Sequence, residues 1–443
     1  MTELLLARSQ MAMLFAFHII FAVAGIGMPV LMVVAEAAFR KTGKAVYHEL
    51  ARRWARGTAV LFAVGAVSGT VLSFELGLLW PRFMGFSGGI IGLPFALEGF
   101  AFFAEAIFLG IYLYGWEKVS PLLHLLSGVA VALGGILSGI FVVTANAWMN
   151  SPAGFTLLNG RPVDISPLAA MLNPAWKTET AHMTLAAFVA TGFAVAGIHA
   201  FMLLRNRENL FHRRALAIAL SMGGAAAVLQ PVSGDFSARF VARHQPAKLA
   251  AMEGQFRTER GAPIRIGGIP DVDAMQTRYA IEIPRGLSLL AFHDPDAEVK
   301  GLSEFPRDEW PNPVPVHLAF QFMVASGTAM SLLSLAAGLF AWRRREWLFH
   351  RHFLRPVAVC GPLGILSVEA GWVVTELGRQ PWAIHGVMRT ADAVTTVGGL
   401  AIPFAFFSLL YLALGIAVAW LLKREVSASP AFPLDGDDGK GAG

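Results

Sequence analysis

The chain has 443 residues, of which 55% are hydrophobic and only 15% are charged. This composition excludes an ordinary soluble globular protein, in which about a quarter of the residues are charged. The formal net charge of +5 does not indicate a nucleic-acid-binding protein, because the basic residues cluster beside apolar segments.

Apolar segments recur along the chain, each long enough to cross a bilayer as a helix of about 20 residues. We expect nine of them, at residues 11–35, 57–80, 91–115, 122–147, 181–204, 214–231, 316–341, 355–377 and 394–422. The first is too long for a removable signal peptide and lacks a small-residue cleavage site. The sequence therefore predicts an all-α integral membrane protein with about nine transmembrane helices in a bundle.

The connections between these segments alternate in charge. Lys and Arg concentrate after the first, fifth, seventh and ninth segments and are scarce in the other connections. Because basic loops stay in the cytoplasm, we expect the amino terminus outside and the carboxyl terminus in the cytoplasm.

Two pairs of glutamates lie inside apolar segments. Glu98 and Glu105 belong to the third segment, and Glu369 and Glu376 belong to the eighth. Seven residues of helix turn through about 700°, so the members of each pair share one face. A charged side chain at mid-bilayer costs about 2.5–3.5 kcal/mol on the insertion scale. These positions indicate metal binding, proton relay or a wet cavity, and hence chemistry or transport inside the membrane.

One connection is unusually long. Residues 232–315 are polar, nearly balanced in charge and rich in proline, and the expected topology places them on the outer side. A connection of this length is usually functional or disordered, so a functional outer domain competes with a passive periplasmic extension. The predicted divisions are helices one to six in 1–231, the outer segment in 232–315, helices seven to nine in 316–425 and a disordered cytoplasmic tail in 426–443.

Several potential metal ligands lie within the apolar segments or at their rims. The histidines among them are His18, His124, His182, His199 and His317. Imidazole must find a partner at membrane depth, so each is either a hydrogen-bonded packing residue or a functional ligand. The expected topology places four residues at one depth near the outer side: His18, His182, Met323 and Glu376. By itself Met323, one of sixteen methionines, favours interpretation as soft core filler.

These ligand types suit haem iron. Cys360 is the only cysteine, which excludes internal disulfides, cysteine zinc sites and iron–sulfur clusters. Imidazole is a strong ligand to iron, and a thioether opposite it raises the potential. A carboxylate is a weak axial ligand that leaves one face of the iron free for a small molecule such as oxygen. The residues alone therefore indicate a multi-haem membrane oxidoreductase.

The stretch GRQPW, from Gly378 to Trp382, directly follows VEAGWVVTEL and resembles subunit I of cytochrome bd-type quinol oxidases. ARSQMAMLFAFH, PFALEGFAFFAEA, FVVTANAWMNSPAG and HQPAKLAAMEG also resemble this family and occur in the family's order. The resemblance covers nearly the whole chain, including the number of segments, the outer amino terminus and the long outer connection after the sixth segment.

The resemblance implies a set of haem ligands. His182 and Met323 would be the axial ligands of a low-spin haem b. His18 and Glu376 would hold the two haems of the oxygen-reducing pair, and the sequence leaves open which residue takes which haem. The implied cofactors are two haem b and one haem d, or a third haem b in place of haem d.

The resemblance also implies a proton route. Glu98 would lie against the oxygen-binding haem, Glu105 would lie one step farther along the route, and Ser138 and Asn146 would extend it. Hydrogen bonding between helices is an equally good interpretation of the last two residues.

The resemblance implies three more residues that would contact the haems. Trp372 would stand between haems, although ordinary aromatic packing explains it as well. Arg8 and Arg379 would pair with haem propionates, a role that the planar guanidinium group suits. For an arginine at the outer rim, the alternative is snorkelling to the interface.

Lys248 and Glu253, in HQPAKLAAMEG, match the lysine and glutamate of the family's quinol site. A carboxylate can accept a proton as quinol is oxidised, and a lysine can hydrogen-bond a quinone oxygen. On one helix these residues would be about 140° apart, so they need not face one another. Without the resemblance, both would be assigned to a solvated surface.

The chain departs from the family pattern in three ways. Gln321 stands two residues before Met323, where members of the family carry arginine, and this change should lower the potential of the low-spin haem. In members of the family, the two glutamates that correspond to Glu98 and Glu105 are often one residue farther apart. The third segment of this chain is therefore expected to lack a local bulge. The long connection is of the short type, without the extra insertion of some members.

The sequence is thus interpreted as the haem-containing subunit of a respiratory quinol:oxygen oxidoreductase of the bacterial cytoplasmic (inner) membrane. Quinol would be oxidised on the outer side, and oxygen would be reduced to water with cytoplasmic protons, which makes the reaction electrogenic. The expected partners are a homologous subunit II, small single-helix accessory subunits, membrane quinol and molecular oxygen, but no nucleic acid.

Two other interpretations stay open. A quinol-linked membrane b-type cytochrome would pass electrons to a partner without reducing oxygen. A proton-coupled transporter would use the buried glutamates as proton couplers, but no internal repeat is evident, which weakens a carrier built from inverted halves.

Overall fold

The computed structural model describes residues 3–428, 430, 432 and 433 of the chain. Within these residues, nine helices are long and apolar enough to cross a membrane. They are α1 (Glu3–Thr42), α2 (Ala45–Leu79), α3 (Pro81–Tyr114), α4 (Pro121–Asn150), α6 (Trp176–Arg205), α7 (Leu210–His244), α10 (Pro313–Arg343), α11 (Arg351–Gly378) and α13 (Ala401–Ser427). The prediction of an all-α membrane protein with about nine spans is confirmed.

Helix α7 is longer than the apolar segment that predicted it. It continues to His244, past the boundary expected at residue 231. Hydropathy detects only the part of a helix that lies in hydrocarbon, whereas backbone hydrogen bonding continues into the interface. The polar extension contains an ion pair between Arg239 and Asp235, one turn apart, with an N–O distance of 2.6 Å. The first part of the expected outer segment is therefore helical.

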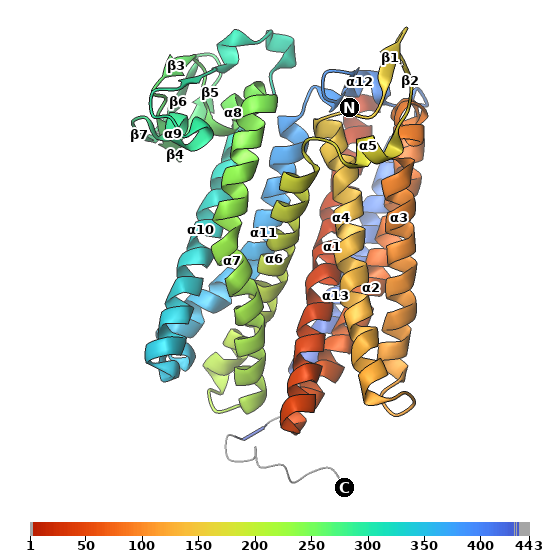
Figure 1. Ribbon diagram of the computed structural model, residues 1–443, viewed down its shortest axis with the longest axis vertical. Helices are drawn as coiled ribbons and strands as arrows, with labels where there is room; N and C mark the ends of the chain where they lie inside the picture. The colour runs from red at the N-terminus through yellow and green to blue at the C-terminus, as the bar shows by residue number, and fades with distance from the viewer. Residues whose placement is uncertain (1–2, 429, 431, 434–443) are drawn as a thin grey trace.

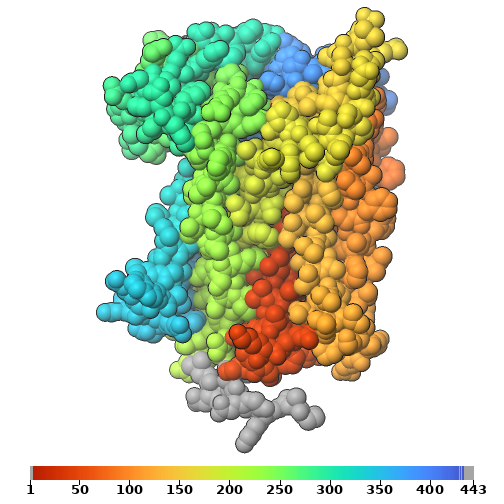
Figure 2. Space-filling model, viewed as in Figure 1, coloured from red at the N-terminus to blue at the C-terminus, as the bar shows by residue number. Residues whose placement is uncertain are grey.

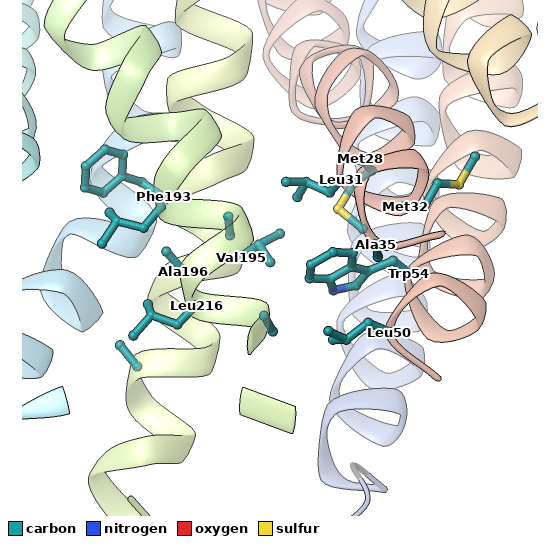
Figure 3. Packing of buried hydrophobic residues seen from close by; sticks show 14 of the residues in the cluster. Met28, Leu31, Met32, Ala35, Leu50, Trp54, Phe193, Val195, Ala196 and Leu216 are labelled. Carbon is teal, nitrogen blue, oxygen red and sulfur yellow. The ribbon is translucent and has the colours of Figure 1, made fainter. Parts of the chain in front are cut away.

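The long helices form two groups that lie side by side (Figure 1). One group contains α6, α7, α10 and α11, and the other contains α1 to α4 with α13 packed on α1 and α2. The groups meet where α1 and α4 contact α6. Figure 3 shows buried residues on both sides of this junction, with Val195 from α6 opposite Leu31 from α1 and Trp54 from α2.

Helix α6 approaches α7 and α11 through paired glycines. A Cβ atom on Gly192 would meet the Cα atom of Gly223 in α7, and a Cβ atom on Gly197 would lie 2.6 Å from the Cα atom of Gly361 in α11. Only glycine permits such close helix crossings. Both neighbours therefore lie against the helix that carries His182.

The connection between α7 and α10 forms a folded lobe at the end of the bundle where α1 begins (Figure 1). Strand β4 pairs with β7, β5 pairs with β6, and β3 pairs with β8, all antiparallel. The elements are α8 (Pro246–Glu253), β3 (Glu259–Arg260), β4 (Ile264–Ile266), β5 (Ile269–Asp271), β6 (Gln276–Arg278), β7 (Ile281–Ile283), α9 (Gly286–Phe292), β8 (Glu298–Val299) and the 3-10 helices η1 (Leu302–Glu304) and η2 (Arg307–Glu309). Leu249, Leu287 and Val299 are buried in a small apolar cluster inside this lobe, which projects beyond the bundle (Figure 2).

The remaining short elements lie in other connections. They are β1 (Thr156–Leu158), β2 (Arg161–Val163), α5 (Pro167–Met171), the 3-10 helix η3 (Arg345–Phe349), β9 (Trp382–Ile384), β10 (Met388–Arg389) and α12 (Thr390–Ala393). Most of the tail that we expect to be disordered lies outside the described residues. Within it, the carbonyl oxygen of Phe432 accepts a hydrogen bond from the backbone N–H of Leu210, at 2.8 Å.

Candidate functional site

His18 lies in α1 and faces α2. Its Nδ1 atom is 2.9 Å from Oγ of Ser68. A Cβ atom on the next residue, Gly69, would lie 2.9 Å from Cε1 of His18, so a glycine here leaves room for the ring. No hydrogen bond to Nε2 of His18 occurs within the described residues, and this atom is therefore available to a ligand.

His182 lies near the start of α6 and faces α7. Its Nδ1 atom is 3.0 Å from Oγ of Ser233, and a Cβ atom on Gly234 would lie 3.6 Å from its Cε1. The side-chain amide nitrogen of Gln230 is 3.2 Å from Nε2 of His182 and 3.2 Å from its carbonyl oxygen. The amide oxygen of Gln230 is buried without a hydrogen-bond partner in the described part of the chain.

Met323 lies in α10 and faces α11. A Cβ atom on Gly371 would lie 3.2 Å from the sulfur of Met323, so this glycine also makes room for a candidate ligand. The neighbouring Trp372 stacks on Phe15 of α1, with ring centroids 6.2 Å apart. Phe15 precedes His18 by one helical turn, and Trp372 precedes Glu376 by one turn. The helix faces that carry His18 and Glu376 therefore adjoin one another.

Glu376 lies near the end of α11, and both of its carboxylate oxygens accept hydrogen bonds. The Asn146 amide donates to Oε1 at 2.7 Å, and Nη2 of Arg379 donates to Oε2 at 2.6 Å. Asn150 extends the network, because it donates to Oδ1 of Asn146 at 3.3 Å and accepts from Nη1 of Arg379 at 3.4 Å. The guanidinium group of Arg379 is buried, and its Nε–H finds no partner among the described residues. Three predicted site residues from two helices thus form one cluster.

Glu179 belongs to this network, and Lys248 of the outer lobe lies close enough to feel its charge. Asn150 donates to Oε1 of Glu179 at 3.0 Å. Lys248 is only 6% exposed, and its stem lies over Gly378, where a Cβ atom would be 3.0 Å from Cγ of the lysine. Burial lowers the pKa of Lys248 to about 8; the nearby Glu179 and Glu376 carboxylates oppose this shift. Sequence reasoning missed Glu179, although an acid one turn before a candidate ligand was visible.

Glu253 ends α8 and is 2% exposed. Burial raises the pKa of its carboxyl group to about 7, and the positive charge of Arg265 opposes the shift. Its Oε2 atom has no hydrogen-bond partner within the residues described. Lys248 and Glu253 therefore have different neighbours, in keeping with the angle of about 140° between them on a helix.

His317 and Gln321 of α10 hold the lobe against the bundle. The ring nitrogens of His317 lie 2.8 Å from the carbonyl oxygen of Met252 and 3.0 Å from that of Gly267. The Gln321 side chain donates to the carbonyl oxygen of Arg265 at 2.8 Å and accepts from the N–H of Gly267 at 2.9 Å. Gln321, which stands where the resemblance leads us to expect arginine, thus binds the backbone of the lobe.

The two remaining histidines of the candidate set have protein partners. His124 lies 3.0 Å from the carboxylate of Glu36 through Nδ1 and 2.9 Å from the carbonyl oxygen of Tyr112 through Nε2. Nδ1 of His199 lies 2.8 Å from Nδ1 of His212. For this pair of candidates, the interpretation as hydrogen-bonded packing residues suffices.

Glu98 and Glu105 of α3 both face α4. Oγ of Ser138 donates to Glu98 at 3.4 Å. A Cβ atom on Gly135 would lie 3.6 Å from Oε1 of Glu105, and one on Gly25 of α1 would lie 3.9 Å from it. That oxygen is buried without a hydrogen-bond partner in the described part of the chain. Ser138 therefore contacts a glutamate of the predicted proton route, whereas Asn146 contacts Glu376.

Arg8 and one carboxylate oxygen of Glu369 have no hydrogen-bond partner within the described residues. Arg8 is half-buried in α1 and makes no hydrogen bond or ion pair within the described residues. Oε1 of Glu369, the other acid of the eighth segment, is buried and likewise has no partner there.

The family model for cytochrome bd terminal oxidase subunit I matches residues 6–430. The chain belongs to this family. It is 39% identical over 428 residues to a Bacillus subtilis (strain 168) protein with the provisional name cytochrome bd menaquinol oxidase subunit I, covering 95% of this chain and 96% of that protein. It is also 32% identical to cytochrome bd ubiquinol oxidase subunit 1 of the same organism, covering 96% of this chain and 94% of that protein. The bd oxidase structure from Geobacillus thermodenitrificans matches with a TM-score of 0.91 and 39% identity, covering 97% of this chain and 99% of that one.

Membership of the cytochrome bd family confirms two predictions, the resemblance and the function as part of a respiratory quinol:oxygen oxidoreductase. Subunits I of this family are multi-pass membrane proteins with haem cofactors and a quinol substrate, and they work with a subunit II.

The residues present fit haem. Gly69 and Gly371 leave space beside a candidate imidazole and a candidate thioether, where a larger side chain would intrude on the ligand. The Nε–H of Arg379 is buried and has no hydrogen-bond partner within the described part of the chain. It is a donor of the kind that a propionate binds. The donor set of imidazole, thioether and carboxylate belongs to iron chemistry rather than to structural zinc.

Proposed function

We propose that this chain oxidises quinol at its lobe and binds the haems of the oxidase, with the lobe and the amino terminus on the outer side of a bacterial inner membrane. One observation carries the proposal. Helix α8, the part of the lobe that packs on α10 and α11, holds two buried ionisable side chains, Lys248 and Glu253. Buried charges without full hydrogen bonding are costly, and they mark functional sites more often than structural ones.

Glu253 is the base that takes a proton from quinol. A carboxyl group whose pKa is raised by burial to about 7 is an effective base near neutral pH. A hollow of about 270 Å³ begins at the next residue, Gly254; most of its lining is polar or charged, including Arg265 and Thr277, and Phe256 and Met275 are its apolar members. Such a mixed lining suits a quinol ring with its oxygens. Lys248, at the other end of α8, supplies an ammonium group that can hydrogen-bond a quinone oxygen.

The haem-binding residues are assigned to two roles. The iron ligands are His182 and Met323 for a low-spin haem b, and His18 and Glu376 for the oxygen-reducing pair, while Arg8 and Arg379 bind propionates. Two of the haems are of type b, and the third is haem d or a further haem b. When bound, haem supplies the electron transfer and the reduction of oxygen to water.

Glu105, Glu98 and Ser138 hold protons on the oxygen-reducing side, and Asn146 extends this set towards Glu376. The Ser138–Glu98 contact and the glycine-lined environment of Glu105 support the assignment. Trp372, stacked on Phe15, fills the space between the helix faces of His18 and Glu376. The acid groups take cytoplasmic protons, while quinol releases its protons outside, so turnover is electrogenic.

The chain works with a homologous subunit II and with small single-helix accessory subunits. The test is a reduced-minus-oxidised spectrum of the purified complex, with and without carbon monoxide, together with quinol-dependent oxygen uptake. We expect haem bands, a carbon monoxide shift and oxygen uptake, and the band positions distinguish haem d from haem b. Colourless protein would favour the proton-coupled transporter. Low-spin bands that carbon monoxide leaves unchanged would favour a b-type cytochrome without oxygen reduction.

A further inference from the structure

The tripeptide Val-Ser-Gly occurs twice in the sequence, at 67–69 in α2 and at 232–234 in α7. Each copy faces one candidate haem histidine on the preceding helix. The serine approaches Nδ1 of the imidazole, at 2.9 Å for Ser68 and at 3.0 Å for Ser233. The glycine that follows lies beside the Cε1 edge of the same ring. The same local arrangement therefore serves His18 and His182.

The direction of each serine–histidine hydrogen bond follows from the other contact of the serine hydroxyl group. Oγ of Ser68 lies 3.1 Å from the carbonyl oxygen of Gly65, and Oγ of Ser233 lies 2.9 Å from that of Gln230. A carbonyl oxygen can only accept, so the single hydroxyl hydrogen of each serine is donated to it. The serine oxygen can then only accept from the imidazole, and Nδ1 must carry a hydrogen.

The second ring nitrogen follows from the first. A neutral imidazole with a hydrogen on Nδ1 has its lone pair on Nε2, which makes Nε2 the metal-binding atom. At His182 the Gln230 amide nitrogen lies 3.2 Å from Nε2 and 3.3 Å from Nδ1, so the tautomer there is argued from the Ser233 contact alone, and the amide must move aside when Nε2 binds iron. At His18, Nε2 makes no hydrogen bond within the described residues.

We infer that Ser68 and Ser233 are positioning residues that select the Nδ1–H tautomer of His18 and His182 and direct Nε2 of each towards haem iron. This inference rests on the proposed function, because it takes the two histidines as iron ligands. Each serine acts through its histidine and does not itself touch the iron. A hydrogen-bond acceptor on the distal nitrogen fixes the orientation of the ring and makes the ligand more basic.

Two effects follow when the acceptor is lost. A less basic imidazole stabilises the ferric state less, so the midpoint potential of the attached haem rises. The ring is also free to change its tautomer and orientation, and loss of such a partner weakens metal binding by about 10- to 100-fold. Both effects are confined to one haem, because the serines lie on different helices and serve different histidines.

The experiment uses the complete purified oxidase complex. His18→Ala and His182→Ala first identify the haem band that each histidine supports. Ser68→Ala and Ser233→Ala are then compared by redox titration of each band and by the rate of haem transfer to excess apomyoglobin. We expect Ser68→Ala to raise the potential and speed the release of the His18 haem alone, and Ser233→Ala to do so for the His182 haem alone.

Serine to threonine is the matched control, because threonine keeps a hydroxyl group at the same position. Ser68→Thr and Ser233→Thr should restore the potential and the slow haem release. Unchanged potentials and release rates in both alanine variants would overturn the inference, as would equal changes at both haems in each variant. If neither histidine variant lost a haem band, the proposed ligand assignment itself would fail, which is a different result from failure of the serines.

Discussion

Asn146 of α4 donates a hydrogen bond to Glu376 of α11 across 2.7 Å, although the two residues are 230 positions apart in the sequence. The opposite oxygen of Glu376 accepts from Arg379 at 2.6 Å. Two donors, one in α4 and one directly after the end of α11, thus hold the plane of one carboxylate. In its proposed role as a weak haem ligand, Glu376 would benefit from such fixation, since a carboxylate has little affinity of its own to set its orientation.

Replacing Asn146 with leucine should therefore weaken haem binding at Glu376. The variant removes one donor and leaves the carboxylate oxygen unpaired, so we expect about a tenfold loss of affinity for the haem at this site. The other two haem bands should persist. Spectra of the purified complex at limiting haem measure the effect, and Asn146→Gln, which keeps an amide, is the control. Uniform loss of all bands would contradict a local role.

The helices could be predicted from the sequence because apolar length is a strong constraint in membrane proteins. Their ends could not be predicted in the same way. The last part of α7, up to His244, is polar, and its stability depends on the interface and on ion pairs such as that of Arg239 with Asp235. The outer segment was predicted as a unit, but the strands inside the lobe were not, because they contain only two or three residues and show no usable alternation.

The candidate site could be predicted residue by residue but not as a network. The family motifs contain both Asn146 and Glu376. Hydropathy, however, does not show how one helix is rotated about its axis relative to its neighbour, so the contact between these residues was not predicted. Glu179 was missed because no motif includes it. Ser68 and Ser233 are the middle residues of a repeated tripeptide, whose role can be recognised only once the facing histidines are known.

The pH dependence of quinol oxidation should be bell-shaped. Glu253 must be deprotonated to accept a proton, and burial raises its pKa to about 7, so the rate should rise as pH increases through 7. Lys248 must be protonated to donate a hydrogen bond, and burial lowers its pKa to about 8, so the rate should fall above 8. The quantity to measure is kcat/KM for quinol, whose pH profile reports the free enzyme.

Glu253→Gln should abolish the rising limb of that profile. A glutamine cannot accept the proton, and we expect turnover to fall by about 10²-fold while every haem band is retained. Unchanged turnover would remove the lobe from the substrate site.

Arg265→Leu should move the rising limb to higher pH. The positive charge of Arg265 opposes the upward shift in the pKa of Glu253, so its removal raises that pKa beyond 7. At pH 7 a smaller fraction of the carboxyl groups is then available as base, and kcat/KM falls there but recovers at higher pH. Arg265→Lys keeps the charge and should keep the limb in place. A uniform fall in kcat/KM at all pH values would instead indicate damage to the lobe.

Glu179→Gln should move the falling limb to lower pH. The Glu179 carboxylate opposes the downward shift in the pKa of Lys248, so its loss lowers that pKa below 8. Glu179→Asp is the control, since it keeps the negative charge. Burial, Lys248 and Arg379 lower the pKa of the neighbouring His385, which is therefore neutral over this range and contributes no limb. A falling limb that stayed near 8 in the glutamine variant would show that Glu179 does not act on Lys248.

Gly69 and Gly234 offer a comparison in which the same substitution should have opposite outcomes. A Cβ atom at Gly69 would lie 2.9 Å from Cε1 of His18, closer than the contact distance of two carbon atoms, so the ring must move. At Gly234 the corresponding distance to His182 is 3.6 Å, which is an ordinary van der Waals contact. Gly69→Ala should therefore displace the imidazole from Ser68 and release the haem bound by His18. Gly234→Ala should leave the His182 haem in place, because its ring need not shift. Spectra of the two variants at equal protein concentration measure the difference, and equal haem content would show that the space beside His18 is not what fixes its ring.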